Sequence, residues 1–98
     1  MPKAYAIFTE TVIDQERYEE YMRASLEPSR KLGAKPLAIS DAPEVVEGQW
    51  NGPRTILVEF ESLEAAHAWY HSPEYQRILP LRTQASRSQF IVVDGIEG

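Results

Sequence analysis

The sequence contains no cysteine. Disulfides, thiolate nucleophiles and cysteine-ligated zinc or iron–sulfur sites are therefore excluded. No apolar run approaches the roughly 20 residues that a membrane-spanning helix needs. The first residues also lack the long apolar region and the small-residue cleavage site of a signal peptide. From these absences we expect a cytoplasmic protein with no membrane partner.

Positive charge is scarce too, since 10 basic residues stand against 15 acidic ones and the net charge is −5. This charge would repel a phosphate backbone, so we expect no nucleic-acid partner. The sequence contains no phosphate-binding loop, no dinucleotide fingerprint and no G-x-S-x-G nucleophile elbow. We expect no cofactor.

Histidine is almost absent, because His67 and His71 are the two that the chain contains. On a continuous helix their spacing of four would place both on one face, as in a metal-binding pair. Carboxylates would have to complete the coordination shell, which makes two histidines a weak signal. We expect no metal site.

The 98 residues, of which 43% are hydrophobic, predict one domain over residues 1–98. Runs of β-branched and aromatic residues predict strands over residues 3–12, 35–40, 53–61 and 88–94. Helical spacing of apolar residues predicts one helix over 15–32, capped by Asp14, and others after Ser62 and from Pro73. Pro28 should kink or interrupt the first helix, and Pro80 should limit the last.

Asn51-Gly52 lies between an extended segment, residues 44–50, and the strand 53–61. We expect a type I′ hairpin turn there, because Asn-Gly is the pair that best tolerates positive φ at both central positions. Residue 46 would then lie opposite residue 57, and residue 44 opposite Glu59.

The element order β-α-β-β-α-β predicts an α+β, ferredoxin-like fold, with a four-stranded antiparallel sheet and two helices on one face. Both faces of this sheet are apolar. In the first strand, for example, Tyr5 and Ile7 oppose Ala6 and Phe8. One helical layer covers one face, and a bare apolar face of that size is rare on a monomer. We therefore expect a homodimer that pairs through its sheet faces.

The stretch Y-H-S-P-E-Y-Q, residues 70–76, has the composition of a helix start. Ser72 is a preferred N-cap residue, and Pro73 suits the first helical position because its missing N–H costs nothing there. Glu74 then favours the positive end of the helix dipole. The cap needs no imidazole, so His71 is either free for a ligand or an ordinary surface residue.

Other candidate site residues are an acid, a tryptophan and an arginine. Glu59 lies within an apolar strand, where burying its charge is costly unless Arg54 or Arg82 pairs with it. Alternatively, Glu59 lies at the solvent-exposed rim of the sheet. Trp50 is either an interface anchor or a pocket wall. Arg82 follows Ile78 and Leu79 at helical spacing and either receives an anion or extends its head away from the core.

Several segments resemble one known family: E-V-V-E-G-Q-W, T-I-L-V-E-F-E-S and A-W-Y-H-S-P-E-Y-Q-R-I-L-P-L-R. The chain is similar to the DUF1330 family of the dimeric α/β-barrel superfamily over residues 3–95. The resemblance implies a ferredoxin-like subunit that pairs through its sheets into a dimeric α/β barrel. Gly33-Ala34 departs from a common Gly-Gly of the family. The residues characteristic of the family are Glu47, Gly48, Glu59, Phe60, Tyr70, Ser72, Pro73, Glu74 and Tyr75.

The superfamily implied by this resemblance includes cofactor-free monooxygenases, muconolactone-type isomerases and stress-response proteins, so fold alone assigns no activity. We expect a homodimeric small-molecule-binding protein, with cofactor-free proton-transfer chemistry as an open question. His71 or Glu59 would act as the base and Arg82 would steady an anion. Trp50, Tyr75, Arg82 and Glu47 would bind the ligand. The alternative is a non-catalytic structural, interaction or stress-related module whose acidic first helix meets a partner.

Overall fold

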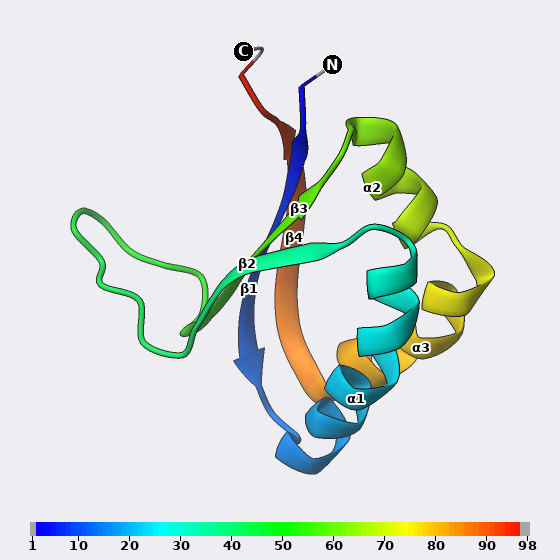
Figure 1. The fold of residues 1–98 in the computed structure, drawn as a ribbon. Helices are drawn as coiled ribbons and strands as arrows, with labels where there is room; N and C mark the ends of the chain where they lie inside the picture. Colours follow the sequence, from blue (N-terminus) through cyan, green and yellow to red (C-terminus); the bar gives the residue numbers. More distant parts are fainter. Residues whose placement is uncertain (1, 97–98) are drawn as a thin grey trace.

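The computed structural model describes residues 2–96. In chain order its elements are β1 (Ala4–Val12), α1 (Gln15–Lys31), β2 (Lys35–Ser40), β3 (Arg54–Phe60), α2 (Leu63–Tyr70), α3 (Pro73–Ala85) and β4 (Ser86–Asp94). The strands form an antiparallel sheet in the order β2-β3-β1-β4. All three helices cover the same face of it (Figure 1). The predicted α+β, ferredoxin-like layout is confirmed, with the second helical region divided into α2 and α3.

Helix α1 begins and ends as its sequence predicts. The Asp14 carboxylate accepts a hydrogen bond from the backbone N–H of Arg17, 3.1 Å away. At the other end Gly33 has φ 91°, and the N–H of Ala34 bonds to the carbonyl of Ser29 at 2.9 Å. This is a Schellman ending, which favours glycine because of the positive φ.

The two internal prolines do not end their helices, so the expected limit at Pro80 is wrong, and of the two outcomes expected for Pro28, a kink or an interruption, the interruption does not occur. Pro28 lies inside α1, which continues to Lys31, and Pro80 lies inside α3, which continues to Ala85. A proline removes one backbone hydrogen bond of the helix. The packing of buried residues on both sides of it, such as Tyr75 and Arg82 of α3, holds the helix together across that loss.

The Tyr70–Gln76 stretch is the junction of α2 and α3. The Ser72 hydroxyl accepts from the N–H of Tyr75 at 3.1 Å and donates to the carbonyl of Trp69 at 2.8 Å. One hydroxyl therefore closes α2 and opens α3, with Pro73 at the first helical position. The predicted helix start is confirmed.

The predicted Asn51-Gly52 hairpin is wrong. Residues 41–53 form a long loop without a strand, and β2 pairs directly with β3, with Lys35 opposite Glu59. Neither Asn51 nor Gly52 has the positive φ of a type I′ turn. A Cβ on Gly52 would lie 2.8 Å from the backbone carbonyl carbon of Glu10, so glycine is required here by close approach.

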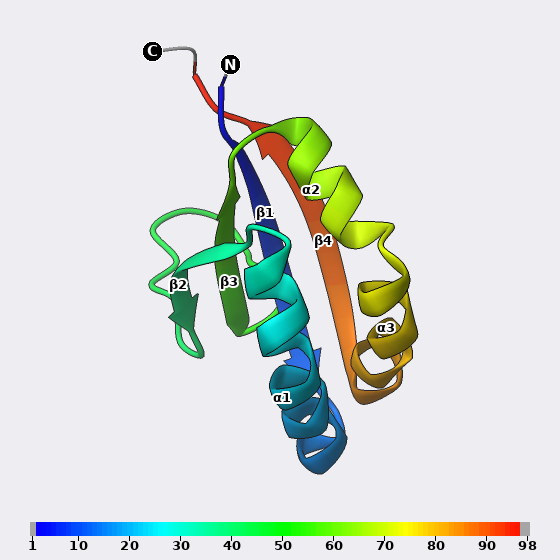
Figure 2. The same cartoon turned by 45° about the vertical axis from the view of Figure 1, so that its right-hand side comes forward.

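The two faces of the sheet are both apolar, as predicted, but differ in cover. Helices α1 and α3 lie side by side over one face, with α2 beyond them (Figure 2). Under them the strands bury Ala4, Ala6, Phe8, Ile56 and Phe60. On the other face, hereafter the open face, Tyr5 and Ile7 pair with Val93, Leu57 and Ile91 of the neighbouring strands.

Within residues 2–96 the open face is exposed mainly along β4, where Ile91 is 56% and Val93 is 40% exposed, whereas Thr9 on the same face of β1 is buried at 6%. The loop 41–53 extends from this side of the sheet, away from the helices (Figure 1). Among the described residues no helix is both long and apolar enough to cross a membrane.

Candidate functional site

A carboxyl group is buried beneath the helices at the end of β1. Glu10 follows Ala6 and Phe8 at the two-residue spacing that keeps side chains on one face of a strand, and it is 1% exposed. The Tyr18 hydroxyl of α1 donates a hydrogen bond to Glu10 Oε1. Among residues 2–96, Glu10 Oε2 is the one buried side-chain oxygen or nitrogen without a hydrogen-bond partner. Such an atom in a native core calls for a functional explanation.

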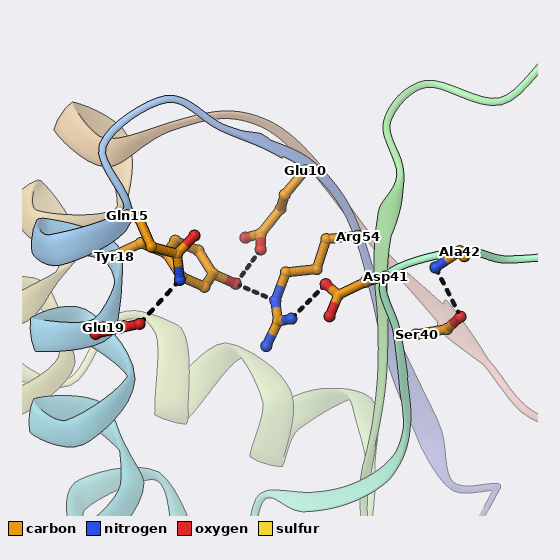
Figure 3. Close-up of polar contacts among 8 residues, drawn as sticks. All are labelled: Glu10, Gln15, Tyr18, Glu19, Ser40, Asp41, Ala42 and Arg54. Atoms are coloured by element: carbon orange, nitrogen blue, oxygen red, sulfur yellow. Dashed lines mark hydrogen bonds and ion pairs between the residues drawn. The ribbon is translucent and has the colours of Figure 1, made fainter.

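Arg54 extends the network toward solvent. Its Nε donates to the Tyr18 hydroxyl at 2.9 Å, and Nη1 donates to the Asp41 carboxylate at 2.6 Å. The residues form a continuous chain from the surface to Glu10 (Figure 3). Glu10 and Arg54 are cross-strand partners, so the register of β1 on β3 brings them together.

A second arginine approaches from α3. Arg82 is 4% exposed, and its guanidinium donates to the Tyr75 hydroxyl at 3.3 Å and to Ser88 Oγ at 2.7 Å. The Tyr21 and Tyr75 hydroxyls share a hydrogen bond of 2.7 Å. Ser88 is the β4 partner of Glu10. Glu10 therefore lies between two arginine-bearing networks, one from β3 and one from α3.

The electrostatics of this cluster are set by burial. Burial raises the pKa of the Glu10 carboxyl above its ordinary value. The Tyr18 hydrogen bond and the charges of Arg82 and Arg54 lower this pKa, but burial outweighs them. Burial is the main cause that raises the pKa of Tyr18, and the hydrogen bond to the Glu10 carboxylate raises it further. The Tyr18 hydroxyl therefore stays protonated and can donate. Burial also raises the pKa of Tyr21. A buried glutamate whose pKa is raised is a candidate to exchange a proton with a bound molecule.

An apolar cavity of about 170 Å³ opens beside Glu10, between α1, β2 and the sheet. Its walls include Phe8, Tyr21, Met22, Ile56, Val58 and Trp69. The polar groups in these walls already have partners: Ser29 Oγ accepts from Trp69 Nε1 at 2.9 Å, and Ser25 Oγ donates to the Met22 carbonyl at 3.3 Å. Glu10, which lines this mostly apolar chamber, carries the unpartnered atom Oε2, and that atom is fully buried.

A second hollow, of about 340 Å³, lies on the other side of Tyr18. Arg54, Asp41 and Glu19 make it polar, and Met22 lines both hollows. The Tyr18 hydroxyl therefore connects this polar hollow, through Arg54, to the Glu10 carboxyl beside the apolar cavity.

The structure brings together two of the residues that the sequence analysis grouped into one pocket, and separates the others. Tyr75 and Arg82 are hydrogen-bonded to each other in the buried cluster. Glu59 lies on the open face, because it alternates with Val58 and Phe60 along β3 and is the cross-strand partner of Tyr5. Its carboxylate pairs with Lys3 Nζ at 3.3 Å. Neither Arg54 nor Arg82 is its partner, since both belong to the Glu10 cluster.

The remaining candidates lie on the surface. Trp50 is 50% exposed in the loop 41–53 and donates its indole N–H to Thr55 Oγ1 at 2.8 Å. Glu47 is exposed in the same loop, and His71 is the exposed C-cap of α2. His67 and His71 have ring centroids 6.4 Å apart. Within residues 2–96 no three histidine, aspartate or glutamate side chains gather closely enough to hold a metal ion.

Sequence reasoning missed Glu10 and Tyr18 and gave Arg54 the wrong partner. The signal for Glu10 was present in A-I-F-T-E, where the alternation that buries Ala6 and Phe8 also carries Glu10 under the helices. Tyr18 is one of the residues of the helix predicted over 15–32, with no role assigned to its hydroxyl. Its bond to Arg54 spans 36 positions, and no local pattern marks such a contact.

Comparison with protein-family models matches residues 3–96 to the model described as "Domain of unknown function (DUF1330)". Comparison with curated proteins gives no match.

Several solved structures share the fold. A protein of unknown function from Rhodopseudomonas palustris is 17% identical with a TM-score of 0.79, over 99% of this chain and 85% of that one. A dimeric ferredoxin-like protein of unknown function from Jannaschia sp. CCS1 is 18% identical with a TM-score of 0.72, over 98% and 99%. SnoaB, a cofactor-independent oxygenase from Streptomyces nogalater, is 10% identical with a TM-score of 0.66, over 100% and 97%. At these identities the likeness shows the fold.

Proposed function

The chain belongs to the DUF1330 family, and we propose that it binds a small molecule in the cavity beside Glu10 and exchanges a proton with it. The observation that carries this proposal is the free Oε2 of a buried carboxyl at an apolar cavity of about 170 Å³. Leaving a buried acceptor unpaired costs about 1–3 kcal/mol. A ligand that donates a hydrogen bond to this oxygen removes that cost.

The proton transfer is simple to balance. The Glu10 carboxylate takes a proton from a C–H or O–H of the bound molecule, becomes a carboxylic acid, and leaves the molecule as its enolate or phenolate. Returning the proton regenerates the carboxylate. Arg54 and Arg82 stabilise the negative charge of the site in both states, because their guanidiniums attract Glu10. Tyr18 is a positioning residue that holds Oε1 and leaves Oε2 free.

This chemistry needs no cofactor, which agrees with the description of SnoaB, of the same fold, as a cofactor-independent oxygenase. Glu10 takes the place of His71 and Glu59 as the proposed base. Glu59 faces away from the cavity beside Lys3, and His71 is exposed at the end of α2. Tyr75 and Arg82 keep a supporting role through their bonds in the buried cluster.

The test combines binding and exchange. Native mass spectrometry of the purified protein reports any retained small molecule, and a fragment screen followed by ¹H–¹⁵N NMR locates binding at Met22 and the Trp69 indole. For a bound fragment with an acidic C–H, wild type should catalyse deuterium exchange. Glu10→Gln should slow it at least tenfold, whereas Glu61→Gln, an exposed acid, should not. Equal exchange in wild type and Glu10→Gln would refute the role of Glu10.

Self-association through the open face is part of the same proposal. Its support is the uncovered apolar surface around Ile91 and Val93, together with a neighbour of the same fold described as dimeric. Absence of nucleic-acid partners and a cytoplasmic location stay predictions from charge and composition.

A non-catalytic interaction module is the second candidate, favoured by the exposed Val46 and Trp50 of the loop 41–53. A protein in which no fragment reaches Met22 or Trp69 would favour it.

A further inference from the structure

We propose that the cavity selects a neutral molecule of about one aromatic ring that donates a single hydrogen bond, a phenol or an enol, to Glu10 Oε2. This inference rests on the proposed function, because it names the class of ligand for the same site. Four features of the cavity carry it: volume, wall chemistry, surrounding charge and wall shape.

The volume limits the ligand to about one ring. The chamber holds about 170 Å³, and an engineered apolar cavity of about 150 Å³ in another protein accommodates benzene. A benzene ring with one or two small substituents therefore fills the space. A fused polycycle exceeds this volume and would protrude from the chamber.

The wall chemistry allows one polar contact. Tyr21, Ser25 and Ser29 line the chamber, and each is engaged with another group of the chain. A second polar group on the ligand would lose its hydration and compete for the Ser25 and Ser29 hydroxyls, which already have partners in the chain, so it gains less than it loses. Glu10 Oε2, the free atom, is an acceptor when the carboxyl is ionised. The ligand must then supply the donor.

The surrounding charge excludes both ionic classes. An anionic ligand such as a carboxylate would place a second negative charge against the buried Glu10, and Arg30 at the cavity wall is already paired with Glu27 at 3.5 Å. A cationic ligand would meet Arg30 at the cavity wall and the fields of Arg54 and Arg82, which already attract Glu10. It would also lose its hydration in an apolar chamber. A neutral O–H donor avoids both costs.

The walls are aromatic on several sides. The rings of Phe8 and Trp69 meet edge to face with centroids 6.4 Å apart, and both line the chamber. Flat ligands gain from stacked and edge contacts with such rings. This shape favours a planar phenol or enol over a branched aliphatic alcohol.

The experiment measures dissociation constants by NMR titration at pH 8 for matched probes: phenol, toluene, benzoate, benzylamine and benzaldehyde. Wild type should bind phenol at least tenfold more tightly than any other probe. Glu10→Gln should invert the preference, since the Tyr18 hydroxyl holds the amide oxygen and turns the NH₂ group toward the cavity. This donor favours the acceptor benzaldehyde over phenol. Glu61→Gln should keep the wild-type order, and Ser25→Leu, which fills the chamber, should abolish binding of phenol.

The outcomes separate the two proposals. If phenol and toluene bind equally at Met22 and Trp69, the cavity is a binding site but the ligand class is wrong. Tightest binding of benzoate or benzylamine overturns the ligand class in the same way. If no probe perturbs those two residues, the proposed function fails together with this inference. If the Ser25→Leu variant still binds phenol, phenol binds elsewhere on the protein, which also overturns the proposed ligand class.

Discussion

On the helix-covered face of the sheet, β1 presents Ala4, Ala6, Phe8 and then Glu10, and each of them is nearly inaccessible to solvent. On the open face the same strand presents Tyr5 and Ile7, and their neighbours Ile91 and Val93 remain 56% and 40% exposed. Both faces are apolar in sequence. They differ in degree: the covered face buries Glu10 and Arg82 almost completely, at 1% and 4% exposed, whereas the side chains of the open-face pair Lys3 and Glu59 remain 46% and 15% exposed.

This difference separates two functions of one sheet. Two ionic groups of the covered face, Glu10 and Arg82, are held away from water under α1 and α3, where electrostatic effects on a ligand are large. The charged pair of the open face, Lys3 and Glu59, lies at its partly exposed rim and contributes little. We infer that the covered face carries ligand chemistry and the open face carries assembly.

The largest expected effect is the loss of a core ring on the covered face. Phe60 is 1% exposed and packs on Trp69 with ring centroids 5.3 Å apart. Phe60→Ala should lower the free energy of unfolding by about 3–5 kcal/mol, because it leaves a cavity as well as losing apolar burial. Urea unfolding followed by tryptophan fluorescence measures it.

Val93→Ala is the matched truncation on the open face. At low protein concentration, where a dimer dissociates, it should cost less than about 1 kcal/mol, since Val93 is already 40% exposed. Equal costs for the two truncations would mean that the two faces are equally covered within one subunit, and the comparison would fail.

The second prediction concerns assembly through the open face. Ile91→Glu places a charge on the exposed apolar surface of β4, beside Ile7, and should weaken the dimer at least tenfold, about 1.4 kcal/mol, without unfolding the subunit. Sedimentation velocity across a concentration series measures the dissociation constant, and circular dichroism checks the fold.

The control for assembly is Leu63→Glu, an exposed apolar residue of α2 on the helical side. It should leave the dissociation constant unchanged. A wild-type protein that stays monomeric at high concentration, or a dimer that Ile91→Glu leaves intact, would remove assembly from the open face.

Alternation along the strands predicted both faces correctly, because side-chain period in a strand depends on local geometry alone. The helix caps at Asp14, Ser62 and Ser72 could also be predicted from the sequence, since each depends on a contact with the residue three positions later. The same alternation places Glu10 on the face of Phe8, and the burial of the Glu10 carboxyl that follows from it was not predicted. The strand was interpreted for its apolar residues, and the acid within it was passed over.

The rest depended on contacts between distant parts of the chain. Asn51-Gly52 has the local signature of a hairpin, but Gly52 is needed where the loop passes over the backbone of Glu10. Tyr21 and Tyr75 meet across 54 positions. Glu59 was grouped with Arg82 although the sheet itself separates them. Such pairings are set by how the helices cover the sheet, and local propensity does not determine them.

The smallest expected effect is a change of stability with pH on the covered face. Burial raises the pKa of Glu10 in the folded protein. An acid with a raised pKa binds its proton more tightly when folded, so its contribution to stability is full below the ordinary glutamate pKa of about 4.3. That contribution is lost as pH rises through the raised pKa of the folded state. Wild type should therefore lose stability relative to Glu10→Gln as pH rises from about 4.3 through the raised pKa of the folded state. The loss is roughly 1.4 kcal/mol for each pH unit that separates the folded pKa from the unfolded one.

Denaturant midpoints of both proteins at several pH values measure this difference, and Glu61→Gln supplies the exposed counterpart. Glu61 is 84% exposed at its side chain, so its replacement should give a nearly flat difference over the same range. A falling difference for Glu10 and a flat one for Glu61 would establish that the covered face, and not acid content in general, makes the protein pH-sensitive. If Glu10→Gln instead loses stability relative to wild type as pH rises, the arginines outweigh burial. Glu10 would then be a structural ion-pair partner in place of a proton acceptor for a ligand.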